Sequence, residues 1–308
     1  MCMRLFDFAF VPNYPEPLDR LKALAANEHW GKNGRMLRSY FNHMFEKVME
    51  DGLLSFHPDG QSAVFHTGLA TRNEKDIYAV FCPNKRDDAQ EWFLRGFSTK
   101  DGIGLGDILQ GYDDLPFRPR FIARSEQAFY SLQYGGPECD WPSILVENVS
   151  RIPRYLIRDT TEDRILLPDM RVVGKERYME YLDEAALRLK NDEGMDRLVA
   201  WFEAALDRTL DRLHMDYKLA VPSWYAKEKC VVLMLPLQVR QNDVNVVITV
   251  KWDEHQGCYH GLNLLTLEMA YNNARLIARP EARWLIDANH SRFKRTSEGH
   301  QYLGRNDQ

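Results

Sequence analysis

The chain has 308 residues, of which 44% are hydrophobic and 28% are charged, and its formal net charge is −5. That length suits one large domain or about two ordinary ones, and the apolar content excludes a disordered chain. A membrane-spanning helix needs about 20 apolar residues, and the longest apolar run of the expected core covers only residues 230–235. The acidic balance argues against a protein that coats nucleic acid, although it allows a local basic groove.

The N-terminus and the cysteines predict a cytoplasmic protein. Asp7 places an acid early in the chain and no small-residue cleavage site follows, so we expect no signal peptide. The cysteines are scattered and form no Cys-x-x-Cys pair, which predicts no disulfide framework. They are Cys2, Cys82, Cys139, Cys230 and Cys258. A reducing compartment is the simplest location for such a chain.

The first third of the chain predicts helices followed by short strands. Residues 5–11 favour a strand or an extended arm. Helices are expected at 17–28 and 36–49, the second because Leu37, Phe41 and Phe45 follow helical spacing. Segments rich in β-forming residues follow, and the last two flank a polar hairpin connection. These segments are 53–56, 63–69 and 77–81, with the connection at 71–76. A winged-helix module is the alternative for this helix-helix-hairpin order.

The middle of the chain predicts more strands and a long loop. The strand-like segments are 91–94, 120–123, 128–133 and 144–147. The connection 98–119 is rich in glycine and then in proline, and it contains the string GIGLG at 102–106. A dinucleotide fingerprint needs a third glycine where this chain has Asp107. We therefore expect a mobile loop there and no phosphate cradle.

The last half predicts a helical hairpin, two strands and a final helix. The hairpin helices are expected at 177–190 and 195–215, joined by 191–194. Strands at 230–239 and 245–252 flank a turn at 241–243, and a helix at 267–278 ends before Pro280. The fold class is thus α+β with largely antiparallel sheets. The polar stretch 158–174 suggests lobes at 1–157 and 158–288, unless both form one continuous domain, and 289–308 is a polar tail.

Standard catalytic signatures are missing from the sequence. There is no Gly-Lys-Ser/Thr phosphate loop, no His-Glu-x-x-His and no Gly-x-Ser-x-Gly string. Such absences exclude only the reactions that use those motifs, because triads assembled from distant segments leave no trace in one sequence. Catalytic residues stay unassigned, and we expect no cofactor.

One cluster resembles a metal site. His255, Cys258 and His260 lie within six residues, next to Asp253 and Glu254. Zinc accepts all of these side-chain types, but a structural zinc site needs four ligands and no second cluster has matching spacing. Because Gly257 indicates a turn between strands, we expect an ordinary polar turn and no metal, with metal binding as the alternative.

The final helix carries a polar face beside its apolar stripe. Glu268, Tyr271, Asn272, Arg275 and Arg279 share that face at helical spacing. Tyr271 can stack a base, Asn272 can read its edge and Arg275 can hold a phosphate. The alternative is a surface helix stabilised by contacts between neighbouring turns.

Two further polar groups interrupt apolar segments. His66, Thr67 and Arg72 surround a glycine, which in a strand marks either a bulge or a close approach by a ligand. Asn148 and Arg151 follow the strand expected at 144–147. The alternative for each group is a structural role at a hairpin rim or a loop cap.

Four stretches of this chain resemble a bacterial family catalogued as domain of unknown function 3825. The most specific is LLTLEMAYNNARLIARPEARWL at 264–285. The others are FHTGLATRNEKDIYAVFCPN at 65–84, LVENVSRIP at 145–153 and LMLPL at 233–237. The resemblance spans about residues 5–287. The family pattern often has Asn in place of His66 and Asp in place of Glu268.

The resemblance implies a role near RNA or nucleotides, because similar proteins are joined to cold-shock-like or other RNA-binding modules. The first hypothesis is therefore binding of a nucleotide or an RNA end by His66, Thr67, Arg72, Asn148, Arg151, Tyr271, Asn272 and Arg275. The second is a phosphodiester or pyrophosphate hydrolase with His66 or Glu268 as acid or base. The third is a protein-interaction component in a stress or defence setting, with the hairpin 177–215 as its partner surface. No membrane partner is expected.

Overall fold

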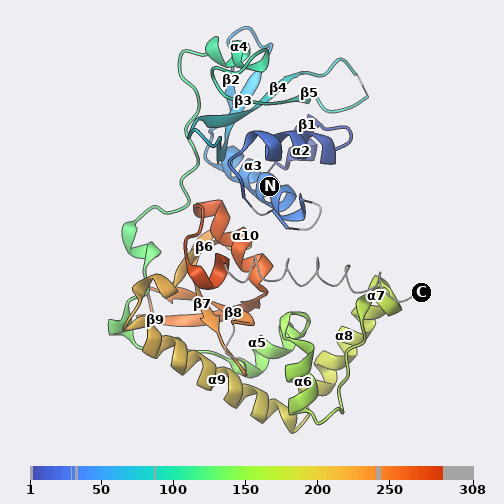
Figure 1. The fold of residues 1–308 in the computed structure, drawn as a ribbon, viewed down its shortest axis with the longest axis vertical. Coiled ribbons are helices and arrows are strands. Elements are labelled where there is room, and N and C mark those ends of the chain that lie inside the picture. Colours follow the sequence, from blue (N-terminus) through green and yellow to red (C-terminus); the bar gives the residue numbers. More distant parts are fainter. Residues whose placement is uncertain (1–2, 29, 32–33, 87, 241–243, 287–308) are drawn as a thin grey trace, which may run out of the picture. The chain divides into compact units, whose positions relative to one another are not determined.

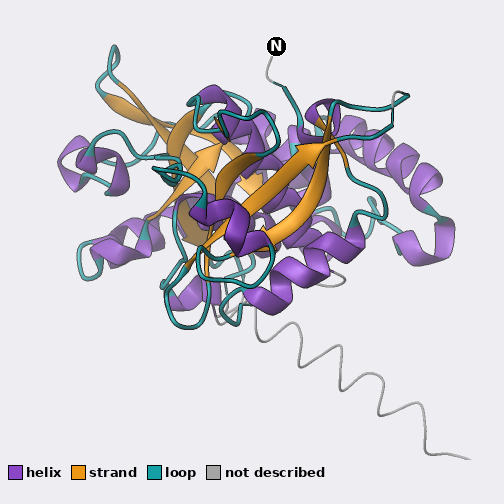
Figure 2. Ribbon diagram, turned by 90° about the horizontal axis from the view of Figure 1, so that it is seen from above, coloured by secondary structure: helices purple, strands orange, loops and turns teal. Residues whose placement is uncertain are grey.

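The computed structural model describes residues 3–28, 30–31, 34–86, 88–240 and 244–286. The chain forms two compact units, Met1–Phe121 and Ile122–Gln308. Helices and strands occur in separate runs rather than alternating regularly, so the fold is α+β as predicted (Figure 1, Figure 2). Within the described residues, no helix has the length and apolar character needed to cross a membrane.

The first unit is a five-stranded sheet with helices. Its helices are α1 (Leu5–Phe8), α2 (Pro15–Leu24), α3 (Arg35–Glu50) and α4 (Leu105–Gln110). Its strands are β1 (Ala9–Phe10), β2 (Ser55–Phe56), β3 (Ala63–Ala70), β4 (Asp76–Pro83) and β5 (Trp92–Ser98). The strand order is β1-β5-β4-β3-β2, with only the β1–β5 pair parallel.

Aromatic side chains join α3 to this sheet. Phe41 and Phe45 on α3 lie 5.5 Å and 5.6 Å, ring centre to ring centre, from Phe65 on β3. Phe65 in turn stacks on Phe81 of β4 at 5.9 Å. The other face of the same strands packs Val64 and Val80 against Leu109 of α4. Because β3 and β4 are covered on both faces, their sequence is almost continuously apolar.

The second unit combines a four-stranded meander with helices. Its strands are β6 (Val221–Tyr225), β7 (Cys230–Leu237), β8 (Val246–Asp253) and β9 (Cys258–Leu265), in the order β6-β7-β8-β9 and all antiparallel. Its α-helices are α5 (Trp141–Glu147), α6 (Arg154–Thr160), α7 (Met170–Val173), α8 (Lys175–Leu189), α9 (Gly194–Leu213) and α10 (Leu267–Ile277). Its short 3-10 turns are η2 (Ser125–Ala128), η3 (Leu132–Tyr134), η4 (Val149–Arg151) and η5 (Tyr217–Leu219).

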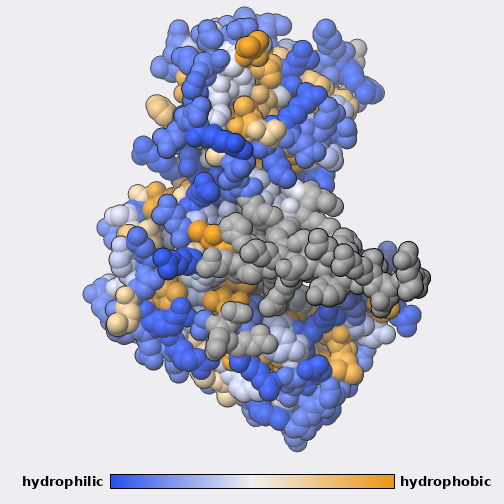
Figure 3. All heavy atoms as spheres, in the orientation of Figure 1, coloured by the Kyte–Doolittle hydropathy of each residue, from blue (hydrophilic) through white to orange (hydrophobic). Residues whose placement is uncertain are grey.

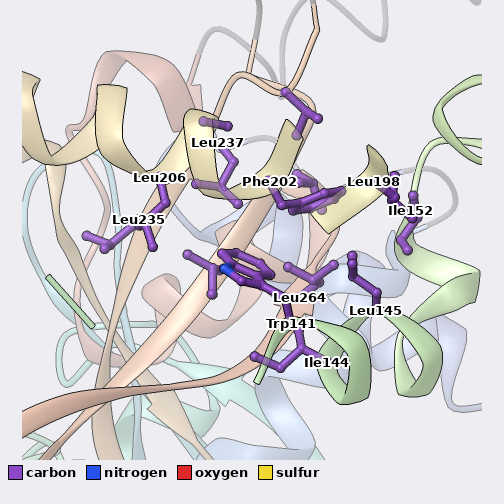
Figure 4. Packing of buried hydrophobic residues seen from close by; sticks show 14 of the residues in the cluster. Trp141, Ile144, Leu145, Ile152, Leu198, Phe202, Leu206, Leu235, Leu237 and Leu264 are labelled. Carbon is purple, nitrogen blue, oxygen red and sulfur yellow. The ribbon is translucent and has the colours of Figure 1, made fainter. Parts of the chain in front are cut away.

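One core lies between the meander and helices α5 and α9. Trp141 on α5 contacts Phe202 on α9 at 5.4 Å between ring centres, and Leu264 of β9 lies beside them (Figure 4). Leu235 on β7 faces the same core and pairs in register with Ile248. Helix α10 packs instead against β6. The meander is thus covered by α9 and α10, which lie in different parts of the sequence.

Several sequence expectations for the middle of the chain were wrong. Residues 144–147 belong to α5, because Asp140 caps its N-terminus by accepting from the Ser143 backbone N–H at 3.3 Å. A short apolar run does not distinguish strand from helix. Residues 120–123 and 128–133 form no strand either, and β6 and β9 were missed.

Other corrections concern the first unit and the domain boundary. Residues 5–8 are helical, and α4 begins within the glycine-rich string expected to be a loop. The β2–β3 hairpin belongs to a five-stranded sheet, so the winged-helix alternative is wrong. The units separate after Phe121 and not after residue 157, because α5 and α6 share the core of α8 and α9. The turn at 241–243 and the tail 289–308 lie outside the described residues.

Candidate functional site

His66 sits in a β-bulge of the first unit. The register between β3 and β4 shifts between His66 and Ala70. The Gly68 backbone N–H donates to His66 Nδ1 at 2.9 Å, and His66 Nε2 lies 3.1 Å from Asp76 Oδ1. Since Nδ1 accepts a hydrogen bond, the neutral ring carries its proton on Nε2. His66 therefore has no unshared lone pair with which to accept a proton from a substrate.

Burial sets the charge of His66. The residue is 6% exposed. Burial lowers the pKa of its imidazole, while the Asp76 carboxylate acts in the opposite direction. The ring is also packed edge-on against Tyr78, with 5.1 Å between ring centres. These contacts favour a neutral histidine that holds the bulge together.

The glycine of the bulge accommodates a close approach from α3. Gly68 has φ +75°, and a Cβ placed there would lie 2.3 Å from Tyr40 Oη. Tyr40 Oη donates to the Thr67 carbonyl at 3.0 Å, and Thr67 Oγ1 donates to the Ile77 carbonyl at 2.7 Å. Arg72 is exposed and donates to Asn27 Oδ1 at 2.8 Å. The chain itself supplies the partners of Thr67 and fills the space above Gly68.

Asn148 and Arg151 connect α5 to β9 in the second unit. Asn148 ends α5, is 4% exposed and donates to the Ile144 carbonyl at 2.8 Å. Arg151 donates to the Leu264 carbonyl at 2.6 Å. Partial burial lowers the pKa of its guanidinium. Both side chains therefore bond backbone carbonyls, as loop caps do.

Helix α10 carries the remaining predicted residues. Its N-terminus is capped by Thr266, whose hydroxyl accepts from the Met269 backbone N–H at 3.3 Å. Tyr271, Asn272 and Arg275 are 5%, 9% and 6% exposed, respectively. Arg151 bonds to the carbonyl of Leu264, which precedes the beginning of α10, whereas Arg275 lies in the last turns of that helix. His66, Thr67 and Arg72 belong to the first unit and form a separate group.

A pocket of about 660 Å³ lies beside the C-terminal end of α10. Its walls come from the end of α9, from η5 with the start of β6, from the last turn of α10, and from the segment 278–284. Trp284 fixes that last segment, because its indole N–H donates to the Leu219 carbonyl at 3.0 Å. Small-ligand pockets have volumes of roughly 300–1,000 Å³, so this one suits a mononucleotide-sized ligand.

The lining of the pocket combines aromatic and cationic side chains. Phe129 and Tyr217 are 51% and 59% exposed, and their ring centres lie 5.9 Å apart. The cationic side chains in the lining are Arg212, Lys218, Arg279 and Arg283, and all are exposed. Among the described residues, none of these cations forms an ion pair with a carboxylate. The acidic lining residues are Asp216 and Glu281.

Sequence reasoning missed most of this pocket. The sequence marks Arg279 only as the end of the polar face of the last helix, and Trp284 only as part of the string at 264–285. Phe129 lies in a segment expected to be a strand and Tyr217 in a connection with no predicted helix or strand, far apart in the chain. Only the three-dimensional fold brings them together, so no local pattern could have predicted them.

The suspected metal cluster has a different composition from the one expected. Glu138 joins Cys258 and His260, and one ligand atom from each lies within 4.8 Å of the others. His255 is not part of this group; its backbone N–H donates to Asp253 Oδ1 in the β8–β9 turn. The cysteines among the described residues are all free of disulfides.

The outer face of the α8–α9 hairpin is mostly polar. Leu182, Ala185 and Leu189 of α8 point into the core, whereas Met179 and Leu187 are 49% and 70% exposed. Charged neighbours surround them, among them the pair Arg188–Glu184 at 3.6 Å. On the face drawn in Figure 3, hydrophobic residues likewise lie in scattered groups among hydrophilic ones.

Comparison with known proteins places the chain in a family. No curated protein and no solved structure matches it. A family model described as "Domain of unknown function (DUF3825)" matches residues 21–284, which include the bulge of β3, the α5–η4 connection and the pocket beside α10. The chain therefore belongs to the DUF3825 family.

Proposed function

We propose that the protein binds a nucleotide or the phosphorylated end of an RNA strand in the pocket beside α10. The observation that carries the proposal is the lining itself, in which two exposed aromatic rings stand among cations without carboxylate partners in the described chain. A nucleobase stacks on aromatic side chains, and phosphate attracts arginine and lysine. A compact ligand with both features is a nucleotide.

Cations are needed to attract an anionic ligand here, because the pocket lies at the C-terminal end of a helix. The C-terminal end of a helix carries partial negative charge and repels anions. Arg279 and Arg283 follow the end of α10, and the same pocket is lined by Arg212 from the last turn of α9 and by Lys218 from η5. Together these side chains offset the helix end and leave a local positive field in a chain of net charge −5.

Binding is a better proposal than hydrolysis. His66, the candidate general base, accepts a hydrogen bond at Nδ1 and faces Asp76 with Nε2, so it lacks a lone pair for substrate.

The free thiols among the described residues suit a reducing compartment, and we propose a cytoplasmic location on that basis.

The test is a titration of the full chain with mononucleotides and with short oligoribonucleotides carrying a 5′-phosphate. We expect saturable binding whose affinity falls as salt rises, because phosphate contacts release counterions. We also expect no product after prolonged incubation. Failure of every member of the panel to bind contradicts the proposal, and formation of a cleaved product shows a hydrolase instead.

A further inference from the structure

The backbone around β9 brings three metal-ligating side chains onto one face. Cys258 and His260 are two residues apart on β9, so their side chains point to the same face of the sheet. Glu138 forms a parallel bridge with His260: its N–H donates to the Tyr259 carbonyl, and its carbonyl accepts from the Gly261 N–H, both at 2.8 Å. These bonds hold Glu138 directly beside the histidine.

A fourth group completes the arrangement from the neighbouring strand. Asp253 ends β8 and is paired in register with Cys258. Its Oδ1 accepts the turn N–H groups of His255 and Gln256, at 2.8 Å and 3.2 Å. Its Oδ2 lies 4.0 Å from His260 Nε2. The second oxygen of Asp253 is therefore directed toward the histidine.

The distances fit one cation. Cys258 Sγ and His260 Nε2 are 3.4 Å apart. Tetrahedral zinc, with Zn–S near 2.3 Å and Zn–N near 2.0–2.1 Å, separates such a pair of ligand atoms by about 3.6 Å. The Glu138 carboxylate oxygen lies within 4.8 Å of both atoms. The pair Cys258–His260 already has the spacing of two zinc ligands, and Glu138 is close enough to reach the same cation by turning its side chain.

The charges around the thiol favour a cation as well. The carboxylates of Glu138 and Asp253 lie beside the Cys258 thiol, Glu138 through the ligand cluster and Asp253 through its register pairing with Cys258. Among the described residues, no lysine or arginine forms an ion pair with either carboxylate. A divalent cation would compensate this concentration of negative charge and bind the thiolate directly.

We propose that Glu138, Cys258 and His260 bind a zinc-class divalent cation, with Asp253 as the fourth ligand. A thiolate and an imidazole select zinc and similar borderline metals, whereas magnesium and calcium prefer all-oxygen sites. His260 and Asp253 side chains are 29% and 33% exposed, so the cation has access from solvent. Metal bound there would clamp the segment preceding α5 onto β9.

The test uses untagged full-length protein that has been treated with chelator and titrated with Co²⁺. We expect a thiolate-to-cobalt charge-transfer band that saturates at one equivalent and disappears in Cys258→Ser. Cys82→Ser is the matched control, because Cys82 is also half-buried but lies on β4 of the other unit. A wild-type protein without the band, or a band that persists in Cys258→Ser, overturns the proposal.

A second measurement separates ligation from folding. We expect His260→Gln and Glu138→Gln to lower the affinity for Zn²⁺ at least tenfold in competition with a chromophoric chelator. In the presence of chelator, the variants should unfold at the same temperature as the wild type. Added Zn²⁺ should then raise the unfolding temperature of the wild type and of Cys82→Ser but not of Cys258→Ser. An equal rise in Cys258→Ser also overturns the site.

Discussion

The bulge of β3 and the pocket beside α10 both gather polar side chains, and they differ in where those side chains find partners. In the bulge, His66 and Thr67 bond to groups of their own unit and are 6% and 0% exposed. In the pocket, Tyr217 and Arg279 are exposed, and the guanidinium has no carboxylate partner in the described chain. A polar residue inside an apolar strand therefore has a structural role here, whereas the side chains proposed to bind a ligand lie mostly in the connections between helices and strands.

The largest expected effect is on the stability of the bulge. Gly68→Ala should lower the free energy of unfolding by about 3 kcal/mol or more, because it adds overpacking to an unfavourable φ. The added Cβ would lie 2.3 Å from Tyr40 Oη, and Tyr40 is fully buried and bonded to Thr67. Denaturant unfolding followed by tryptophan fluorescence measures the change.

Gly60→Ala is the matched control for that substitution. Gly60 has φ +69°, but nothing lies within 4 Å of its added Cβ. Gly60→Ala should lower the free energy of unfolding by only about 1 kcal/mol, which is the cost of placing alanine at a positive φ. Equal losses in the two variants would show that the contact with Tyr40 contributes nothing to the bulge.

The next effect concerns binding and leaves stability unchanged. Tyr217→Ala should weaken nucleotide affinity by about 1–3 kcal/mol through loss of stacking, while Tyr217→Phe should bind as the wild type does. Because the Tyr217 ring is 59% exposed, the free energy of unfolding should change by less than about 0.5 kcal/mol. Parallel fluorescence titrations and denaturant curves measure both. Loss of stability together with binding would assign Tyr217 a structural role.

The smallest effect is a pH dependence of the bulge. Burial lowers the pKa of His66 in the folded protein, so the unfolded chain binds a proton more readily. Stability contributed by the neutral ring is complete above the ordinary histidine pKa of about 6.5 and declines as pH falls below it. Unfolding free energies measured across this range should show the decline, and His66→Asn should show less of it. An unchanged slope in the variant would assign the decline to other groups.

The sequence predicted the elements with strong periodicity and missed those defined by tertiary contacts. Helices α3, α8, α9 and α10 and strands β3, β4, β7 and β8 were expected near their observed positions. The helices carry apolar stripes long enough to indicate a helical period, and the strands are runs rich in β-forming residues that are bounded by polar turns. The strand predicted at 144–147 is part of helix α5. Its short apolar run fits a strand or a helix equally well, and the Asp140 cap and the contact of Trp141 with Phe202 favour the helix.

The candidate site was less predictable than the fold. Tyr271, Asn272 and Arg275 share a helix, and their spacing predicted a common polar face, but their side chains are largely buried. Phe129 and Tyr217 meet only because the α9–β6 connection folds back beside η2. Glu138 joins the metal-ligand cluster through a single bridge to β9. These contacts join residues that are far apart in the chain, so no local sequence pattern predicts them.

The most direct test of the central claim is the dissociation constant of a 5′-phosphorylated oligoribonucleotide for Arg279→Ala–Arg283→Ala. Its control is Arg177→Ala–Lys190→Ala, which removes two exposed cations, one on α8 and one at its C-terminal cap, that do not line the pocket. The account predicts at least tenfold weaker binding for the pocket variant, since each charge-assisted contact contributes about 1.5–3 kcal/mol, and wild-type binding for the control. Equal affinities for the two variants would contradict it.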